Sequence, residues 1–117
     1  MRTPTRRHSG ALELARRYQE KGPEAWALYL LAASQKGSPR AQTTHVRDTY
    51  LDALRRSEAL GMRPLSAHCH LGLGRLYHRR DRDSEAKVEL SRAVDLYRQM
   101  DMQFFLKQAE SDLQAIN

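Results

Sequence analysis

The stretch LGLGRLYHRRDRDSEAKVELSRAVDLY, residues 71–97, decides the fold class of this chain. On both sides of its charged run its apolar residues recur three and four positions apart, as at Leu73, Leu76 and Tyr77. This spacing is the period of one face of an α-helix. Asp83, just after the run, is a residue type that caps the start of a helix. The stretch therefore predicts two helices, over 64–80 and 83–100, joined by a short turn.

The helical pattern continues along the rest of the chain. β-branched residues are scarce, strong helix formers dominate, and no long segment alternates apolar and polar residues as a strand would. Helix ends are predicted where Gly comes shortly before Pro, at Gly22–Pro23, Gly37–Pro39 and Gly61–Pro64. Asp101 is expected to cap the last helix. The sequence thus predicts an all-α protein of antiparallel helices, spanning 9–21, 23–36, 39–60, 64–80, 83–100 and 102–115.

Composition and charge narrow the class of protein. The chain has 117 residues, of which 40% are hydrophobic and 29% charged, as expected of one soluble domain with one core. Its net charge is +6, and the stretch MRTPTRR supplies half of this, so residues 1–8 are expected to form a basic, flexible tail. One cysteine excludes an internal disulfide, and no apolar run approaches the ~20 residues of a membrane span. We expect a cytoplasmic protein.

The spacing of small and large apolar residues along the chain indicates an internal repeat. The positions that carry it in the later unit are Leu73, Gly74, Tyr77, Ala86, Leu90 and Ala93. Their pattern resembles the tetratricopeptide repeat, a helix–turn–helix unit of ~34 residues that stacks into a solenoid. In the earlier unit Trp26, Tyr50 and Ala53 take matching positions, although Ala33 stands where the pattern has Tyr. The resemblance implies a helical-repeat domain over 9–117, with units at about 23–60 and 64–100 between flanking helices 9–21 and 102–115.

A narrower resemblance covers about residues 10 to 113. The run from Leu60 to Glu110 is similar to the C-terminal tetratricopeptide segment of large bacterial signalling proteins, which carry nucleotide-cyclase or kinase-like and ATPase domains upstream. The resemblance implies a protein-binding scaffold in bacterial signalling. None of the catalytic residues of those upstream domains lies in this chain.

The stretch HCHLGLG, residues 68–74, contains histidines, a cysteine and glycines of the kinds found in metal, catalytic and phosphate sites. Their positions are better explained by an ordinary helix. His68 and His70 are two positions apart and point to nearly opposite sides of a helix, so they cannot share one metal ion. Cys69 has no base on its own face, and the two glycines lack the strand and third glycine of a phosphate loop. We expect no metal, no cofactor and no catalytic activity.

A basic groove is the functional hypothesis. In tetratricopeptide arrays the first helix of each unit lines a concave groove, and the resemblance assigns that role to His68, Leu71, Arg75, His78 and Arg79. Such a surface would suit an acidic peptide, because arginine pairs with carboxylates through two parallel hydrogen bonds. The same side chains could equally form a solvated helix face.

Two other functions remain open. The chain could be a spacer or self-association segment of a larger protein, joined through Phe104 and Phe105, of which at least one should face outward. Weak nucleic-acid binding through the basic surface is the second alternative, and it would require strongly salt-dependent binding.

Overall fold

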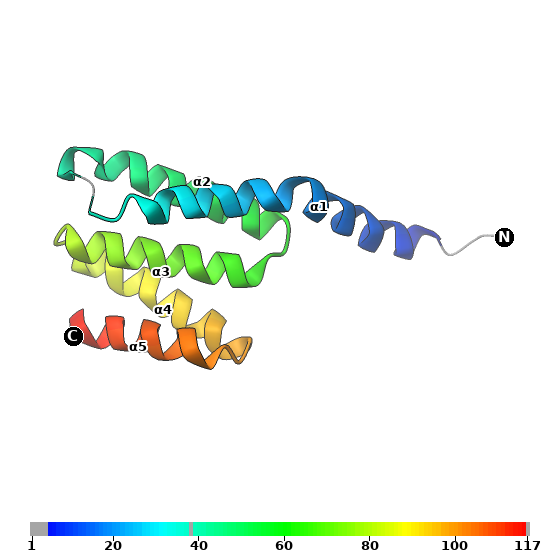
Figure 1. Ribbon diagram of the computed structural model, residues 1–117. Helices are drawn as coiled ribbons and strands as arrows, with labels where there is room; N and C mark the ends of the chain where they lie inside the picture. The colour runs from blue at the N-terminus through cyan, green and yellow to red at the C-terminus, as the bar shows by residue number, and fades with distance from the viewer. Residues whose placement is uncertain (1–4, 38, 117) are drawn as a thin grey trace.

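The computed structural model describes residues 5–37 and 39–116, and helices make up nearly all of them (Figure 1). Side chains are described from Leu12 onward, except those of residues 14 and 38. The helices are α1 (Thr5–Ser34), the 3₁₀ turn η1 (Arg40–Gln42), α2 (Thr43–Ala59), α3 (Arg63–Arg79), α4 (Asp83–Gln99) and α5 (Gln103–Ile116). The all-α class is confirmed, but the described residues form five α-helices rather than six.

The missing boundary lies inside α1. A helix end was predicted at Gly22, and this prediction was wrong, because the backbone stays helical through Gly22 and Pro23. Proline pushes the preceding residue out of the helical region by clashing with its Cβ, and glycine has no Cβ. The helix can therefore continue, although Pro23 cannot donate a backbone hydrogen bond. Of the predicted tail, residues 5–8 belong to α1, and residues 1–4 lie outside the described part.

Three turns of the same design connect the later helices. Gly61, Asp81 and Asp101 sit at these turns with φ of 70°, 61° and 56°. The next residue then donates its backbone N–H to a carbonyl five positions back, which is the Schellman pattern. These bonds run from Met62 to Ser57 at 2.8 Å, from Arg82 to Tyr77 at 2.9 Å and from Met102 to Tyr97 at 2.9 Å. Asp81 and Asp101 can fill these places because Asp tolerates the left-handed conformation better than most residues.

Two of the predicted helix N-caps differ from the structure. Asp101 ends α4 rather than capping α5, and Asp83 is the first residue of α4 rather than the residue before it. Gly37 and Gly61 do adopt the left-handed conformation expected at helix ends. Helices α2 to α5 begin 20 residues apart, at positions 43, 63, 83 and 103, so a pair of helices repeats every 40 residues. This period is longer than the ~34 residues of the tetratricopeptide repeat.

The helices form two layers. Helices α1, α3 and α5 run in the same direction in one layer, and α2 and α4 lie behind them and run the opposite way (Figure 1). Each helix packs against the next one in the chain, and α3 also contacts α1 and α5. The first half of α1 extends beyond this body, which gives the molecule extents of 60 × 29 × 21 Å.

Helix α3 lies at the centre of the molecule, so both of its sides are buried. One apolar cluster joins it to α1 and α2, and a second joins it to α4 and α5. Of the residues expected to pack the repeats, Trp26 is half-buried, and the others are buried: Tyr50, Ala53, Leu73, Gly74, Tyr77, Ala86, Leu90 and Ala93. The two glycines of α3 allow close contacts, since a Cβ would lie 2.4 Å from the Tyr50 ring at Gly72 and 2.6 Å from the Leu90 side chain at Gly74.

Candidate functional site

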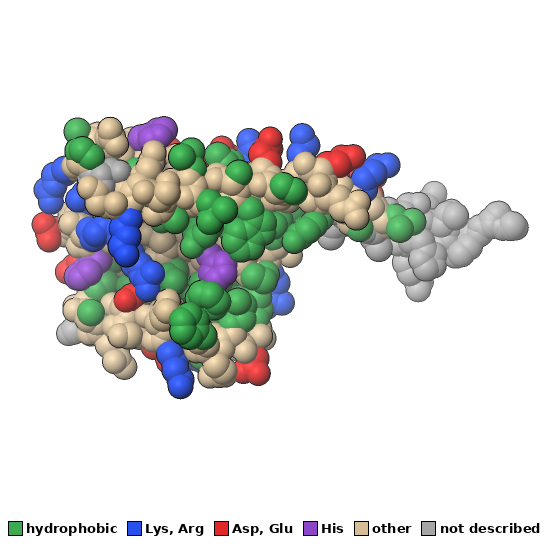
Figure 2. Space-filling model, viewed as in Figure 1, with side chains coloured by type: hydrophobic (Ala, Val, Ile, Leu, Met, Phe, Trp, Pro, Cys, Tyr) green, Lys and Arg blue, Asp and Glu red, His purple; other side chains and the backbone are tan. Residues whose placement is uncertain are grey.

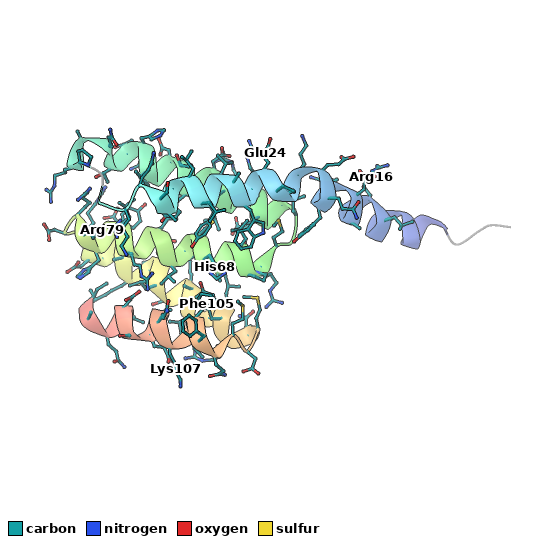
Figure 3. The ribbon with its side chains drawn as sticks, in the orientation of Figure 1. Arg16, Glu24, His68, Arg79, Phe105 and Lys107 are labelled. Atoms are coloured by element: carbon teal, nitrogen blue, oxygen red, sulfur yellow. The ribbon has the colours of Figure 1, made fainter. Side chains whose placement is uncertain are left out.

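The layer of α1, α3 and α5 presents a surface that we call the front face. Figure 2 shows hydrophobic side chains gathered around a histidine in the middle of this face, with Lys and Arg side chains toward the C-terminal end of α3. Figure 3 places His68 on α3 next to Phe105 of α5, and Arg79 farther along α3. The front face thus has an aromatic part and a basic part.

The aromatic part is a cluster of rings from four helices, which we call the aromatic cluster: Trp26, Tyr29, His68, Tyr97 and Phe105. The His68 ring lies at its centre, with its centroid 4.7 Å from that of Phe105, 5.5 Å from Tyr97, 5.9 Å from Tyr29 and 6.0 Å from Trp26. Tyr97 is fully buried beneath the other rings, which are half-buried. The cluster therefore leaves aromatic surface at the front face.

His68 is held in place by a hydrogen bond. Its Nδ1 lies 2.6 Å from the hydroxyl oxygen of Tyr97 on α4. Burial lowers the pKa of His68, because the charged imidazolium loses solvation inside the cluster. The neutral ring is therefore favoured near pH 7, and His68 acts as one more flat, weakly polar ring.

The basic part is organised by an ion pair between α3 and α5. Arg75 Nε lies 2.6 Å from Asp112 Oδ2, and both side chains are partly exposed. Two adjoining hollows share these two residues. The smaller, of about 130 Å³, is lined by Arg75, His78, Arg79, Leu90, Asp112 and Ala115. The larger, of about 500 Å³, is lined by Arg75, Phe104, Lys107, Gln108, Ser111 and Asp112.

Among the described residues, neither Arg79 nor Lys107 of this region has a carboxylate partner. Within the described part of the chain Arg79 makes no hydrogen bond and no ion pair, whereas Arg75 is paired with Asp112. The pKa of Arg79 is lowered, mainly because its guanidinium is partly desolvated, and the positive charges of Arg80 and Arg75 add to the effect. Arginine still remains protonated at neutral pH. Arg79 therefore presents an uncompensated positive charge at the smaller hollow.

The five residues predicted to line a groove divide between three places. Arg75, His78 and Arg79 line the smaller hollow together, and the Nδ1 of His78 lies 3.1 Å from an Asp83 carboxylate oxygen. His68 belongs to the aromatic cluster instead. Leu71 is only 5% exposed and packs in the core between α3, α4 and α5, so little of its side chain can reach a ligand.

The two phenylalanines of α5 also differ in their surroundings. Phe105 is half-buried against His68 and Tyr97, whereas Phe104 is 68% exposed and packs edge-on against Phe105. The sequence did not reveal Asp112 as the partner of Arg75 or Tyr29 as part of the cluster. Only the helical spacing of Trp26 and Tyr29, three positions apart, could have placed those two rings together.

The remaining reactive groups are engaged in the interior. Cys69 is fully buried, and burial raises the pKa of its thiol to about 12, which leaves the thiolate nucleophile almost absent. The Nδ1 of His70 lies 2.7 Å from a Glu89 carboxylate oxygen, in a contact that joins α3 to α4. His68 and His70 thus contact different partners. In the part of the chain that is described, no three His, Cys, Asp or Glu side chains are grouped as a metal site requires.

None of the described helices is both long enough and apolar enough to cross a membrane. No family model matches this chain, and no match was found among curated proteins or among solved structures.

Proposed function

We propose that this chain is a non-enzymatic, helical-repeat protein–protein interaction module whose front face binds an acidic segment of a partner protein. The observation behind the proposal is Arg79, an exposed arginine with no carboxylate partner among the described residues, which lines a hollow of about 130 Å³. A carboxylate from a partner would supply the missing charge. Arginine binds carboxylates in a planar, two-bonded geometry that lysine cannot match.

The helical-repeat part of the proposal rests on the regular period of the chain. Four successive helices start 20 residues apart, and three turns share one hydrogen-bond pattern. Stacked helix pairs of this kind bury their faces only against neighbouring pairs and often bind partners on one layer. A tetratricopeptide-like solenoid, a bacterial signalling role and a cytoplasmic location rest on the sequence resemblance and belong to the same proposal.

The proposal predicts that reversing the charges of the basic part abolishes partner binding. The test variant is Arg75→Glu with Arg79→Glu, and the matched control is Arg55→Glu with Arg92→Glu, which makes the same charge change at exposed sites on α2 and α4. Each tagged protein is used to capture partners from its native host, and the bound proteins are quantified by mass spectrometry. Circular dichroism checks that both variants stay folded.

We expect at least one protein to be captured by the wild-type chain and the control, but not by the front-face variant. Equal capture by all three chains would show that the basic part is not a binding surface, and the proposal would then be wrong.

Self-association is the second candidate, and the exposure of Phe104 favours it. Phe104 is 68% exposed on α5, the last helix of the layer, where a further helix could stack. The mass of the chain in solution, measured by analytical ultracentrifugation, distinguishes the two functions. A dimer that dissociates on Phe104→Asp would support self-association, and a monomer at high concentration would exclude it.

A further inference from the structure

We infer that the front face recognises two features of its ligand at once: an extended peptide segment that carries an apolar or aromatic side chain about four or six positions from an Asp or Glu. The aromatic cluster would receive the apolar side chain, and Arg79 would receive the carboxylate. This inference rests on the proposed function and adds the chemistry of the ligand to it.

The distance between the two sites follows from α3, which carries both. His68 and Arg75 are seven residues apart on this helix, and His68 and Arg79 are eleven apart. At a rise of 1.5 Å per residue these separations correspond to about 10 Å and about 16 Å along the helix axis. An extended chain advances about 3.3 Å per residue, so it would span the distance from His68 to Arg79 with about five residues. Successive side chains of an extended chain point to opposite faces, so two side chains that both face the protein are about four or six positions apart.

The surface between the two sites can accommodate such a segment. The larger hollow reaches from Phe104, next to the aromatic cluster, to Arg75 and Asp112, and the smaller hollow continues from there to Arg79. Gln108 and Ser111 line this path, and both can bond to the backbone of an extended peptide. The two hollows together therefore run from Phe104, which packs against Phe105 at the edge of the aromatic cluster, to Arg79.

The charges along this path favour an acidic ligand. Arg75, Arg79 and Lys107 are positive, and only Asp112 among the lining residues of the two hollows is an acid. Arg75 already forms an ion pair with Asp112, so Arg79 is the arginine that remains to bind a carboxylate of the ligand.

The charges also argue against the most obvious internal occupant, α1 of a second copy. In residues 12–21 that projecting helix carries Arg16, Arg17 and Lys21 against two acids, Glu13 and Glu20, so its net charge is positive. It would therefore bring positive charge toward Arg79.

The experiment uses a series of synthetic peptides of about twelve residues, long enough to cover both sites. Each peptide has blocked ends, a Gly/Ser backbone, one Phe and one Glu, and the members differ only in the separation of Phe from Glu. Trp26 is the only tryptophan in the chain and belongs to the aromatic cluster, so its fluorescence reports occupancy of that site. Amide chemical shifts from NMR report the Arg79 end independently.

We expect peptides with separations of about four or six to bind best, at least tenfold more tightly than those with separations of about one or eight. Arg79→Glu is expected to remove this binding, and the matched reversal Arg92→Glu is expected to preserve it. Because deleting a ring of the cluster would also weaken the fold, the aromatic contact is tested on the peptide. Replacing its Phe with Ser is expected to remove the fluorescence change.

The other outcomes separate the inference from the proposed function. Binding that needs Arg79 but ignores the Phe and its separation would overturn the inference and leave the proposed function standing. If no peptide binds but the Arg75→Glu, Arg79→Glu chain loses its captured partner, the inference alone is overturned. If no peptide binds and capture is unchanged, both are wrong.

Discussion

Replacing Gly74 with Ala adds one methyl group at the crossing of α3 and α4, and we expect it to destabilise the protein. The new Cβ would lie 2.6 Å from Leu90 Cγ and Cδ2, and 3.3 Å from the Leu90 backbone nitrogen. Leu90 is 1% exposed, so its side chain has no free space into which it can turn. Overpacking of this kind costs about 2–3 kcal/mol, near the upper end of the usual range. The better helix propensity of Ala returns about 1 kcal/mol.

The net effect is a loss of about 1–2 kcal/mol in the free energy of unfolding, or about 5–10 °C in Tm for a domain of this size. Urea and thermal unfolding followed by circular dichroism measure it. A double-mutant cycle then tests the cause. In the wild-type chain, Leu90→Ala should lower the free energy of unfolding by about 2–5 kcal/mol. In the Gly74→Ala chain the same substitution should lower it by at least about 1 kcal/mol less, because the shorter side chain makes room for the added methyl group. If Gly74→Ala instead stabilises the protein, α3 and α4 are not in close contact at this point.

Three further predictions concern the interior and the front face. Cys69 is buried with its pKa raised to about 12, so at about pH 8 the native chain is expected to react with a thiol reagent only as fast as it unfolds, and an immediate reaction would disprove this burial. The pKa of His68 is lowered by burial, so the unfolded state binds its proton more readily, and stability falls as the pH drops below about 6.5. His68→Gln should therefore lose less stability between about pH 7 and pH 5 than the wild type, as thermal unfolding would show, and equal losses would refute this assignment. Asp112→Asn removes the carboxylate that pairs with Arg75, at a stability cost below about 1 kcal/mol. The freed positive charge is expected to tighten binding of the Phe–Glu peptide several-fold in a fluorescence titration. Weaker binding would show that the charge of Arg75 does not attract the acidic ligand.

The helices could be predicted from the sequence because each depends on local spacing, but some of their ends could not. Gly37 and Gly61 end helices, as glycine before proline suggests. Gly22 also precedes a proline, directly rather than two or three positions later, and does not end a helix, because the packing of the following residues against α2 and α3 favours a continuous helix. The turns between 80 and 83 and between 100 and 102 were predicted, but the left-handed conformation of Asp81 and Asp101 was not, because Asp is more common as a helix cap than in that conformation.

The site was predicted only in part, because its contacts join distant residues. Arg75 and Asp112 are 37 positions apart, and nothing in the spacing of either residue indicates the other. The aromatic cluster draws its rings from α1, α3, α4 and α5, so only the assembled layers reveal it. The repeat register did place Arg75, His78 and Arg79 on one side of α3, since that relation depends on helical period alone.

The central claim is that the front face is where a partner binds, and site-specific photocrosslinking tests it most directly. A photoreactive phenylalanine analogue is introduced at Ser111, which lines the larger hollow, and in a second chain at Lys87, an exposed position on α4. We predict that the Ser111 position gives an adduct heavier than the chain by the mass of a different protein, that Arg79→Glu removes this adduct, and that the Lys87 position gives none. An adduct from Lys87 alone, or one at Ser111 that contains two copies of this chain, would contradict the account.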